Sequence, residues 1–184
     1  EHLKDFWKFL EENIEINYNI NKEKIWSLLS AIARNNNIQL VIKDSTRHGT
    51  HYSSTTFMNK YAAANNIEFV GNEANSPKLI DWSDCTIAFG SSIGTEVLCQ
   101  NKTLINPYYL ISNRTHFEKF NAAINAKNQE EVLGSLSTMI NKESLNIDKK
   151  AKTMLFREFI YGGKEIHDVL EAYYENIVNE YLLY

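Results

Sequence analysis

The sequence is poor in several residues that mark particular classes of protein. Among its 184 residues it has two cysteines, two prolines and seven glycines. Cys85 and Cys99 form no Cys-x-x-Cys motif or Cys/His cluster, so a zinc site is not indicated. Both lie within expected core elements, and we expect them to be reduced thiols of a cytoplasmic protein. The chain shows no internal repeat and no low-complexity linker.

Long apolar runs and an excess of basic residues are missing as well. No apolar stretch approaches the roughly 18 residues that span a bilayer. The chain does not begin with a basic and then apolar leader, so secretion is not indicated. A formal net charge of −4 disfavours a nucleic-acid-binding protein, which usually carries a basic face. What remains is an ordinary globular composition, 43% hydrophobic and 23% charged, long enough for one well-buried core.

Apolar periodicity predicts that helices and strands alternate along most of the chain. Strands are expected at Ile38–Ile42, Ile67–Val70, Thr86–Phe89 and Thr103–Asn106. Helices are expected at 1–14, Lys22–Asn35, near Thr55–Asn65, as a short turn at Ser76–Trp82, after Gly90, and then at Phe117–Ala126, Gln129–Ile140, Ile147–Phe159 and Lys164–Leu182. In the last helix, one face is apolar and carries Ile166, Val169, Leu170, Tyr173, Ile177 and Tyr181, which is typical of an ordinary core-facing helix.

This alternation predicts an α/β fold, a Rossmann-like three-layer domain with a parallel sheet and a helix-rich C-terminus. We assign residues 22–184 to that domain and residues 1–21 to an N-terminal helical or linker segment. A nucleotide-binding α/β domain usually opens with a strand, and residues 1–21 offer only a weak candidate. We therefore expect the chain to be the C-terminal half of a larger protein.

The loop after the strand at Thr86–Phe89 is rich in glycine and hydroxyl groups. If Ser92 caps the following helix, Ser91 and Thr95 remain able to bind a phosphate at the helix N-terminus. Gly94 would let the ligand approach the backbone closely. The alternative for these residues is that the two serines only cap a helix.

Glu96 lies one turn into the same helix. Its carboxylate suits a ribose diol, or it interacts only with the helix dipole. Spacing alone leaves both interpretations open.

A second polar loop follows the strand at Ile38–Ile42. Lys43 and Arg47 suit a diphosphate, the first as a point charge and the second as a planar fork, and Thr46 adds a hydroxyl. His48 is a candidate general acid or base. The alternative is a solvated polar loop in which Asp44 pairs with Lys43. In an open parallel sheet both loops occupy positions where ligands bind.

Three further residues near these segments are candidates for structural roles. Asp84 is expected mainly to tie down the entrance of a strand. Tyr108 and Tyr109 follow Pro107 and are able to stack on a base, although packing in the core is the commoner use of tyrosine.

Three segments together resemble a known family. They are IQLVIKDSTRHG, LIDWSDCTIAFGSSIGTEVLCQNKTLINPYYL, and the long C-terminal helix after a Gly-Gly break. Over residues 22–182 the chain resembles the C-terminal, nucleotide-binding domain of a GT-B glycosyltransferase. In particular, the chain resembles bacterial capsular or lipopolysaccharide biosynthesis proteins, near the glycerophosphotransferase and UDP-N-acetylglucosamine 2-epimerase relatives.

The resemblance implies a nucleotide-diphosphate sugar as the donor substrate, with no metal and no further cofactor. Ser91, Ser92 and Thr95 would hold the diphosphate and Glu96 the ribose, while Lys43 and Arg47 would neutralise the leaving group. It also implies a glycan or lipid-linked acceptor, a missing N-terminal acceptor domain, no nucleic-acid partner, and a cytoplasmic location at the periphery of the inner membrane.

The chain departs from that family in two ways. Asp44-Ser45 stands where relatives often have His-Pro, which puts a catalytic His48 in doubt. The acceptor domain that usually supplies the base is absent, so we expect the chain alone to bind a nucleotide without turning over. An epimerase-like isomerase domain and a degenerate binding or scaffold module remain the alternatives.

Overall fold

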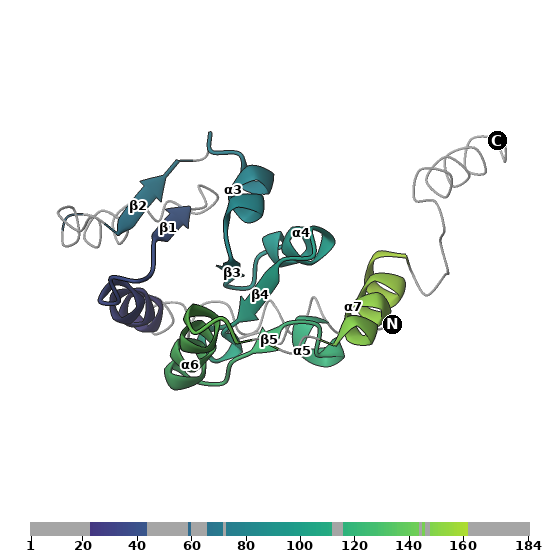
Figure 1. Ribbon diagram of the computed structural model, residues 1–184. Coiled ribbons are helices and arrows are strands. Elements are labelled where there is room, and N and C mark those ends of the chain that lie inside the picture. Colours follow the sequence, from purple (N-terminus) through teal and green to yellow (C-terminus); the bar gives the residue numbers. More distant parts are fainter. Residues whose placement is uncertain are drawn as a thin grey trace, which may run out of the picture.

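A computed structural model of the chain describes residues 23–43, 59, 66–71, 73–111, 116–143, 145 and 148–161 (Figure 1). A helix over residues 23–33 comes first among them. The elements that follow are β1 (Leu40–Lys43), β2 (Ile67–Val70), α3 (Ser76–Trp82), β3 (Cys85–Ile87), α4 (Ile93–Cys99), β4 (Thr103–Asn106), the 3-10 helix η2 (Tyr108–Leu110), α5 (His116–Phe120), β5 (Ile124–Asn125), α6 (Gln129–Ile140), α7 (Lys149–Leu155) and the π-helical turn η3 (Phe156–Ile160).

All strand pairs in these residues are parallel, as the α/β prediction requires. β1 pairs with β2, with Leu40 opposite Ile67. β4 lies between β3 and β5, with Thr86 opposite Leu104 and Ile105 opposite Ile124. In this part of the chain the strands form a two-stranded and a three-stranded sheet.

Side chains of neighbouring β4 residues enter two different apolar clusters, because successive residues of a strand point to opposite faces. Leu104 packs in a cluster with Ile80 of α3, Val97 of α4 and Leu155 of α7. Ile105 packs in a second cluster, together with apolar residues of the helix at 23–33 and of α6. The domain therefore has three layers, helix–sheet–helix, which confirms the predicted Rossmann-like architecture.

The two sheets share one of these clusters. Leu40 of β1 and Ile87 of β3 both pack against the cluster around Leu28 and Ile105. The sheets are thus joined by apolar side chains, although no backbone ladder connects them in the described strands.

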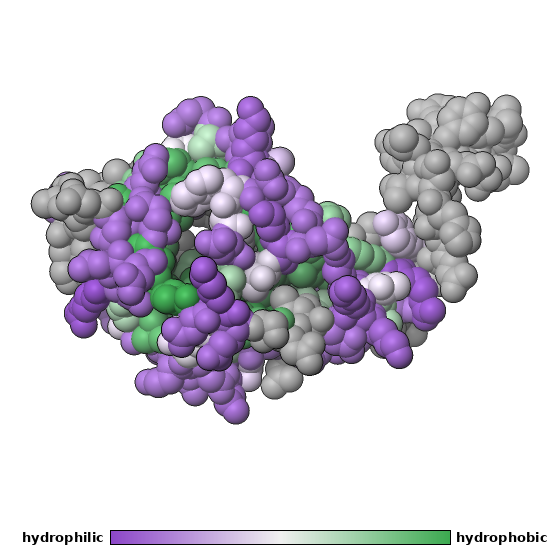
Figure 2. Space-filling model, viewed as in Figure 1, coloured by the Kyte–Doolittle hydropathy of each residue, from purple (hydrophilic) through white to green (hydrophobic). Residues whose placement is uncertain are grey.

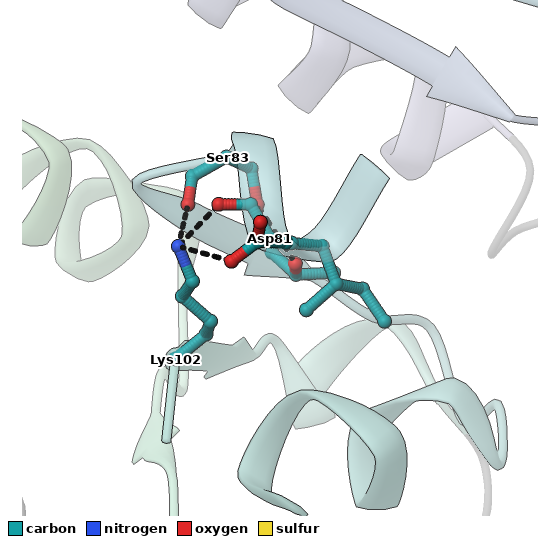
Figure 3. A network of polar contacts seen from close by, with 5 residues as sticks. Asp81, Ser83 and Lys102 are labelled. Atoms are coloured by element: carbon teal, nitrogen blue, oxygen red, sulfur yellow. Dashed lines mark hydrogen bonds and ion pairs between the residues drawn. The ribbon is translucent and has the colours of Figure 1, made fainter. Parts of the chain in front are cut away.

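The C-terminal end of α3 is closed by a side chain that directly precedes β4. The Nζ group of Lys102 donates to the carbonyl oxygen of Asp81 and, at 3.5 Å, to that of Ser83 (Figure 3). The Asp81 carboxylate adds an ion pair at 3.7 Å. Because the last carbonyls of a helix have no partner within the helix, this lysine joins α3 to the three-stranded sheet.

Three helical segments end on a residue other than glycine in the left-handed conformation. The φ angles are +57° at Asn101, +54° at Asn121 and +58° at Lys142. In each case the next N–H donates to a carbonyl five residues back, the hydrogen bond of the Schellman motif. These bonds are Lys102 to Val97 at 3.1 Å, Ala122 to Phe117 at 3.0 Å and Glu143 to Thr138 at 3.1 Å.

Most of the predicted elements in the described ranges are confirmed. The bounds of α3, β2, β4 and α6 are those expected, and β1 and β3 are shifted by one or two residues. The helix predicted at Phe117–Ala126 is wrong, since α5 ends at Phe120 and β5 follows. Asn121 closes that helix, and this frees Ile124 and Asn125 to pair with β4. The helix predicted at Ile147–Phe159 begins at Lys149 and continues as the π-turn η3.

The helices expected at 1–14, near Thr55–Asn65 and at Lys164–Leu182 lie outside the described residues. So does the whole of residues 1–21, which we assigned to an N-terminal helical or linker segment.

The two cysteines have different environments. Cys85 is half-buried, and this burial together with the nearby Asp84 charge raises its pKa to about 11. Cys99 is exposed at the end of α4, so its predicted place in the core is wrong. It falls on the solvent side of a helix whose buried residues are Gly94, Val97 and Leu98.

Hydrophilic residues cover much of the face seen in Figure 2, with hydrophobic ones between them. None of the helices in the described ranges combines the length and apolarity needed to cross a membrane.

Candidate functional site

The loop after β3 turns sharply at Gly90. Its φ is +63°, in the left-handed region that side chains disfavour. A Cβ atom at this position would lie 3.2 Å from Cγ2 of Ile111, closer than most such contacts. The chain therefore needs glycine here to bring Ser91 and Ser92 to the start of α4.

The hydrogen bonds of the turn differ from the predicted cap. Ser92 has helical dihedrals, φ −57° and ψ −18°, and its hydroxyl makes no capping bond. A capping residue typically has extended dihedrals, and the capping bond predicted for the Ser92 hydroxyl is absent although Ser92 directly precedes α4. The Oγ atom of Ser91 takes that part instead, since it accepts from the N–H of Ile93 at 3.3 Å.

Backbone carbonyls satisfy the next two N–H groups of α4. The N–H of Gly94 donates to the carbonyl of Ser91 at 3.2 Å, and that of Thr95 donates to the carbonyl of Ser92 at 3.0 Å. This tight turn engages donors that we expected to face a phosphate. An anion beside this loop would thus be held mainly by hydroxyl groups.

The polar side chains of the loop differ in exposure. Ser91, Ser92 and Glu96 are exposed and Thr95 is half-buried. The four polar residues predicted for this part of the site therefore lie together on one turn that follows the carboxyl end of β3, three of them exposed and one half-buried. A carboxylate in the first turn of a helix is also favourable for the helix itself, so Glu96 serves α4 whether or not it contacts a ligand.

Gly94 is buried and faces the protein. A Cβ atom there would lie 2.7 Å from Cζ of Phe117 and 3.1 Å from Cδ2 of Leu104. The missing side chain thus allows α4 to approach β4 and α5 closely. Packing explains this glycine, and its contact with a ligand stays a prediction.

Lys43 is exposed at the carboxyl end of β1. Its Nζ group donates to the carbonyl oxygen of Ala74, just before α3 begins. The lysine therefore joins the end of β1 to the start of α3. The other candidates of that loop, Thr46, Arg47 and His48, lie outside the described residues.

The tyrosines after β4 are both half-buried. Tyr109 packs against the cluster around Ile105, and its hydroxyl is buried with no hydrogen-bond partner in the described part of the chain. Burial, and then the charge of Glu130, raises the pKa of this phenol. A neutral, core-facing Tyr109 agrees with the packing interpretation. Asp84, expected to tie down a strand, is exposed just before β3.

An open cavity of about 710 Å³ lies elsewhere, beside the turn between α5 and β5 and the start of α7. It contains none of the predicted site residues, and its lining is Asn121, Ala123, Ile124, Asn125, Leu145, Asp148 and Lys149. Nδ2 of Asn125 donates to Oδ1 of Asn121 at 3.3 Å, so these two amides bind each other. The sequence carried no signal for this cavity, because β5 was interpreted as part of a helix.

No cluster of three or more histidines, cysteines or acidic residues in the described ranges is suited to hold a metal ion. In comparisons with known proteins, no family model, no curated protein and no solved structure matches the chain.

Proposed function

We propose that the chain is the nucleotide-sugar-binding domain of a glycosyltransferase that builds a bacterial surface polysaccharide. The observation that carries the proposal is the position of the Ser91–Glu96 turn. It directly follows the carboxyl end of β3 in a parallel sheet with helices on both faces, where open α/β sheets bind ligands.

The side chains of this turn suit a nucleotide diphosphate. Ser91 and Ser92 present exposed hydroxyls, which donate to phosphate oxygens. Glu96 is exposed one turn further along and is able to accept from the two hydroxyls of a ribose. Lys43 supplies a cation at the end of β1, and Arg47 belongs to the segment that follows it.

Such a site would act mainly by stabilising the leaving group. When a glycosyl bond to a nucleotide diphosphate breaks, negative charge develops on the diphosphate, and preorganised donors lower the barrier. Arg47 would bind that charge in a bidentate way. The acceptor and its base would come from a domain outside this chain, so the chain alone would bind the donor without turnover.

A thermal-shift panel with UDP, CDP, GDP, CMP and UDP-sugars tests donor binding on the 184-residue chain. A ligand at a hundred times its Kd stabilises the folded state by about 2.7 kcal/mol, which raises the Tm of a chain this long by roughly 5–10 °C. A shift with one diphosphate supports the proposal and identifies the base.

The double variant Ser91→Ala with Thr95→Ala tests whether this turn is the site. The matched control is Ser137→Ala with Thr138→Ala, which removes the hydroxyl groups of a serine and a threonine in α6. Since Ser91 also caps α4, each variant is compared with its own ligand-free Tm. We expect the ligand-induced shift to fall only in the first variant, and an unchanged shift there would rule the turn out as the binding site.

One observation favours a scaffold module as the second candidate. The N–H groups of Ile93, Gly94 and Thr95 are all engaged within the turn, which weakens it as an anion site. If no nucleotide shifts the Tm of this chain, the panel is repeated on the full-length protein. A response only there means that the second domain completes the pocket, whereas none in either supports the scaffold.

A further inference from the structure

The open cavity beside β5 and α7 has the size of a ligand pocket. Its volume of about 710 Å³ falls within the range of about 300–1,000 Å³ that is usual for such pockets. Two separate parts of the chain form its wall, the turn and strand at Asn121–Asn125 and the start of α7. Ala123 is buried, and Ile124 and Leu145 are half-buried, so part of the wall is aliphatic.

The protein itself fixes one amide of this wall. Nδ2 of Asn125 donates to the carbonyl of Phe117 at 3.2 Å and to Oδ1 of Asn121 at 3.3 Å. Oδ1 of Asn125 accepts from Asn106, a side chain that is only 1% exposed. Because these bonds use both N–H groups of Asn125, this residue orients its neighbour Asn121 and has no donor left for a ligand.

Three other polar groups of the wall are available to a ligand. Nδ2 of Asn121 and Nζ of Lys149 have no hydrogen-bond partner in the part of the chain that the structure describes. One oxygen of the Asp148 carboxylate caps α7 by accepting from the N–H of Lys150 at 2.8 Å, and no described residue engages the other. The exposed side of the cavity therefore offers an amide donor, an ammonium donor and a carboxylate acceptor.

These groups suit a neutral polar ligand better than an ion. An anion beside Lys149 would also meet the Asp148 carboxylate, and a metal cation beside Asp148 would meet the ammonium. A zwitterion would pair with both charges, but ion pairs at exposed positions contribute little. The hydroxyls of a saccharide accept from Asn121 and Lys149 and donate to Asp148. Its C–H faces pack on Ile124 and Leu145, which removes apolar surface from water.

We propose that this cavity is a binding site for a neutral saccharide, separate from the Ser91–Glu96 turn. Phe117 of α5 contacts both places, since its ring lies against Gly94 of α4 and its carbonyl accepts from Asn125 at the cavity. The site is inferred from the cavity alone. Its role, to hold the body of the polysaccharide between successive transfers, rests on the proposed function.

An array of bacterial surface oligosaccharides tests the site without any nucleotide. It is probed with the 184-residue chain, labelled with a fluorophore at the exposed Cys99 so that the lysines stay unmodified. We expect neutral oligosaccharides to bind. The strongest of them is then titrated into isotope-labelled protein, where NMR should show shifts of amides at 121–125 and 148–150 and none in the Ser91–Glu96 turn.

Variants of the first turn of α7 test the contacts. Lys149→Ala removes the ammonium donor and should weaken binding of the selected oligosaccharide about fivefold or more. Asp148→Asn replaces the free acceptor by a donor and should weaken it similarly, while asparagine still caps the helix. Lys150→Ala is the matched control, because Lys150 is an exposed neighbour that does not line the cavity, and it should leave the Kd unchanged.

Three results would overturn the proposal. They are an array on which no neutral oligosaccharide binds, amide shifts that lie in the Ser91–Glu96 turn instead of the cavity, and a loss of affinity in Lys150→Ala equal to that in Lys149→Ala. If a variant fails to fold, the amide shifts of the wild-type chain decide. The nucleotide panel is independent of these results, so saccharide binding without a nucleotide response would support this site and count against the transferase function.

Discussion

Asn106 and Asn125 are direct neighbours on β4 and β5, and their side-chain amides are hydrogen bonded. Nδ2 of Asn106 donates to Oδ1 of Asn125 at 2.9 Å, and Asn106 is only 1% exposed. Asn125 in turn donates to the carbonyl of Phe117 at 3.2 Å. A polar pair inside an apolar sheet thus fixes the short strand β5 to β4 and to the end of α5.

Loss of this pair should destabilise the domain. Asn106→Ala removes the donor to Oδ1 of the half-buried Asn125, and the loss of such a hydrogen bond typically costs about 0.5–1.5 kcal/mol. We expect a lower midpoint in urea unfolding with an unchanged slope. Asn36→Ala, at an exposed position, should change the free energy of unfolding by less than about 0.5 kcal/mol. Equal stability of the two variants would mean that the amide pair contributes nothing.

Two glycines should respond oppositely to alanine. Gly90→Ala introduces a side chain at a φ of +63° and a contact with Ile111, and we expect a loss of about 1–2 kcal/mol. Gly134 lies within α6 with no atom within 4 Å of its would-be Cβ, so Gly134→Ala should stabilise by about 0.5–1 kcal/mol. Urea unfolding of both variants measures the difference. A stabilising Gly90→Ala would contradict the turn described here.

A glycine is missing where the fold favours one. Lys142 has a φ of +58° at the end of α6, and Lys142→Gly relieves that strain. Relief of the strain should raise the free energy of unfolding by about 0.5–1 kcal/mol. The entropy that glycine adds to the unfolded chain reduces this gain. Lys142→Ala removes the same charge and side chain without relieving φ, so it should not stabilise. A Tm that rises equally in both would assign the effect to charge.

Short-range sequence patterns predicted the helices and strands that are defined by neighbouring residues. β2 and β4 are short apolar runs between polar breaks, and α6 has a helical apolar stripe that begins after Asn128. β5 was missed because alanine favours helices and the strand is only two residues long. Asn121 ends α5, but an asparagine is a weaker stop signal than a glycine, and the sequence has few glycines.

The position of the candidate site was predictable from the sequence, but the hydrogen bonds and packing partners of its residues were not. Gly90 and the two serines indicated a tight turn before a helix, and the structure has that turn. Which serine caps α4 depends on the dihedrals of Ser92, which a Ser-Ser pair does not reveal. The roles of Gly94 and Lys43 depend on Phe117 and Ala74, which lie 23 and 31 residues further along the chain. Such partners are set by tertiary packing.

The two thiols should react at very different rates. Cys99 is exposed, whereas burial raises the pKa of Cys85 to about 11. Since the thiolate is the reactive form, only about one molecule in a thousand carries it at Cys85 at pH 8. With a disulfide reagent at pH 8, we expect one thiol per native chain to react rapidly and the second only after unfolding. Cys99→Ser should abolish the fast phase and Cys85→Ala should leave it intact. The raised pKa also means that the unfolded state loses this proton more easily, so the contribution of Cys85 to stability is complete below pH 9 and declines as the pH rises from 9 toward 11. A fast phase that persists in Cys99→Ser would show that Cys85 is open to solvent. The cluster around Leu28 and Ile105 would then be less tightly packed than in the structure.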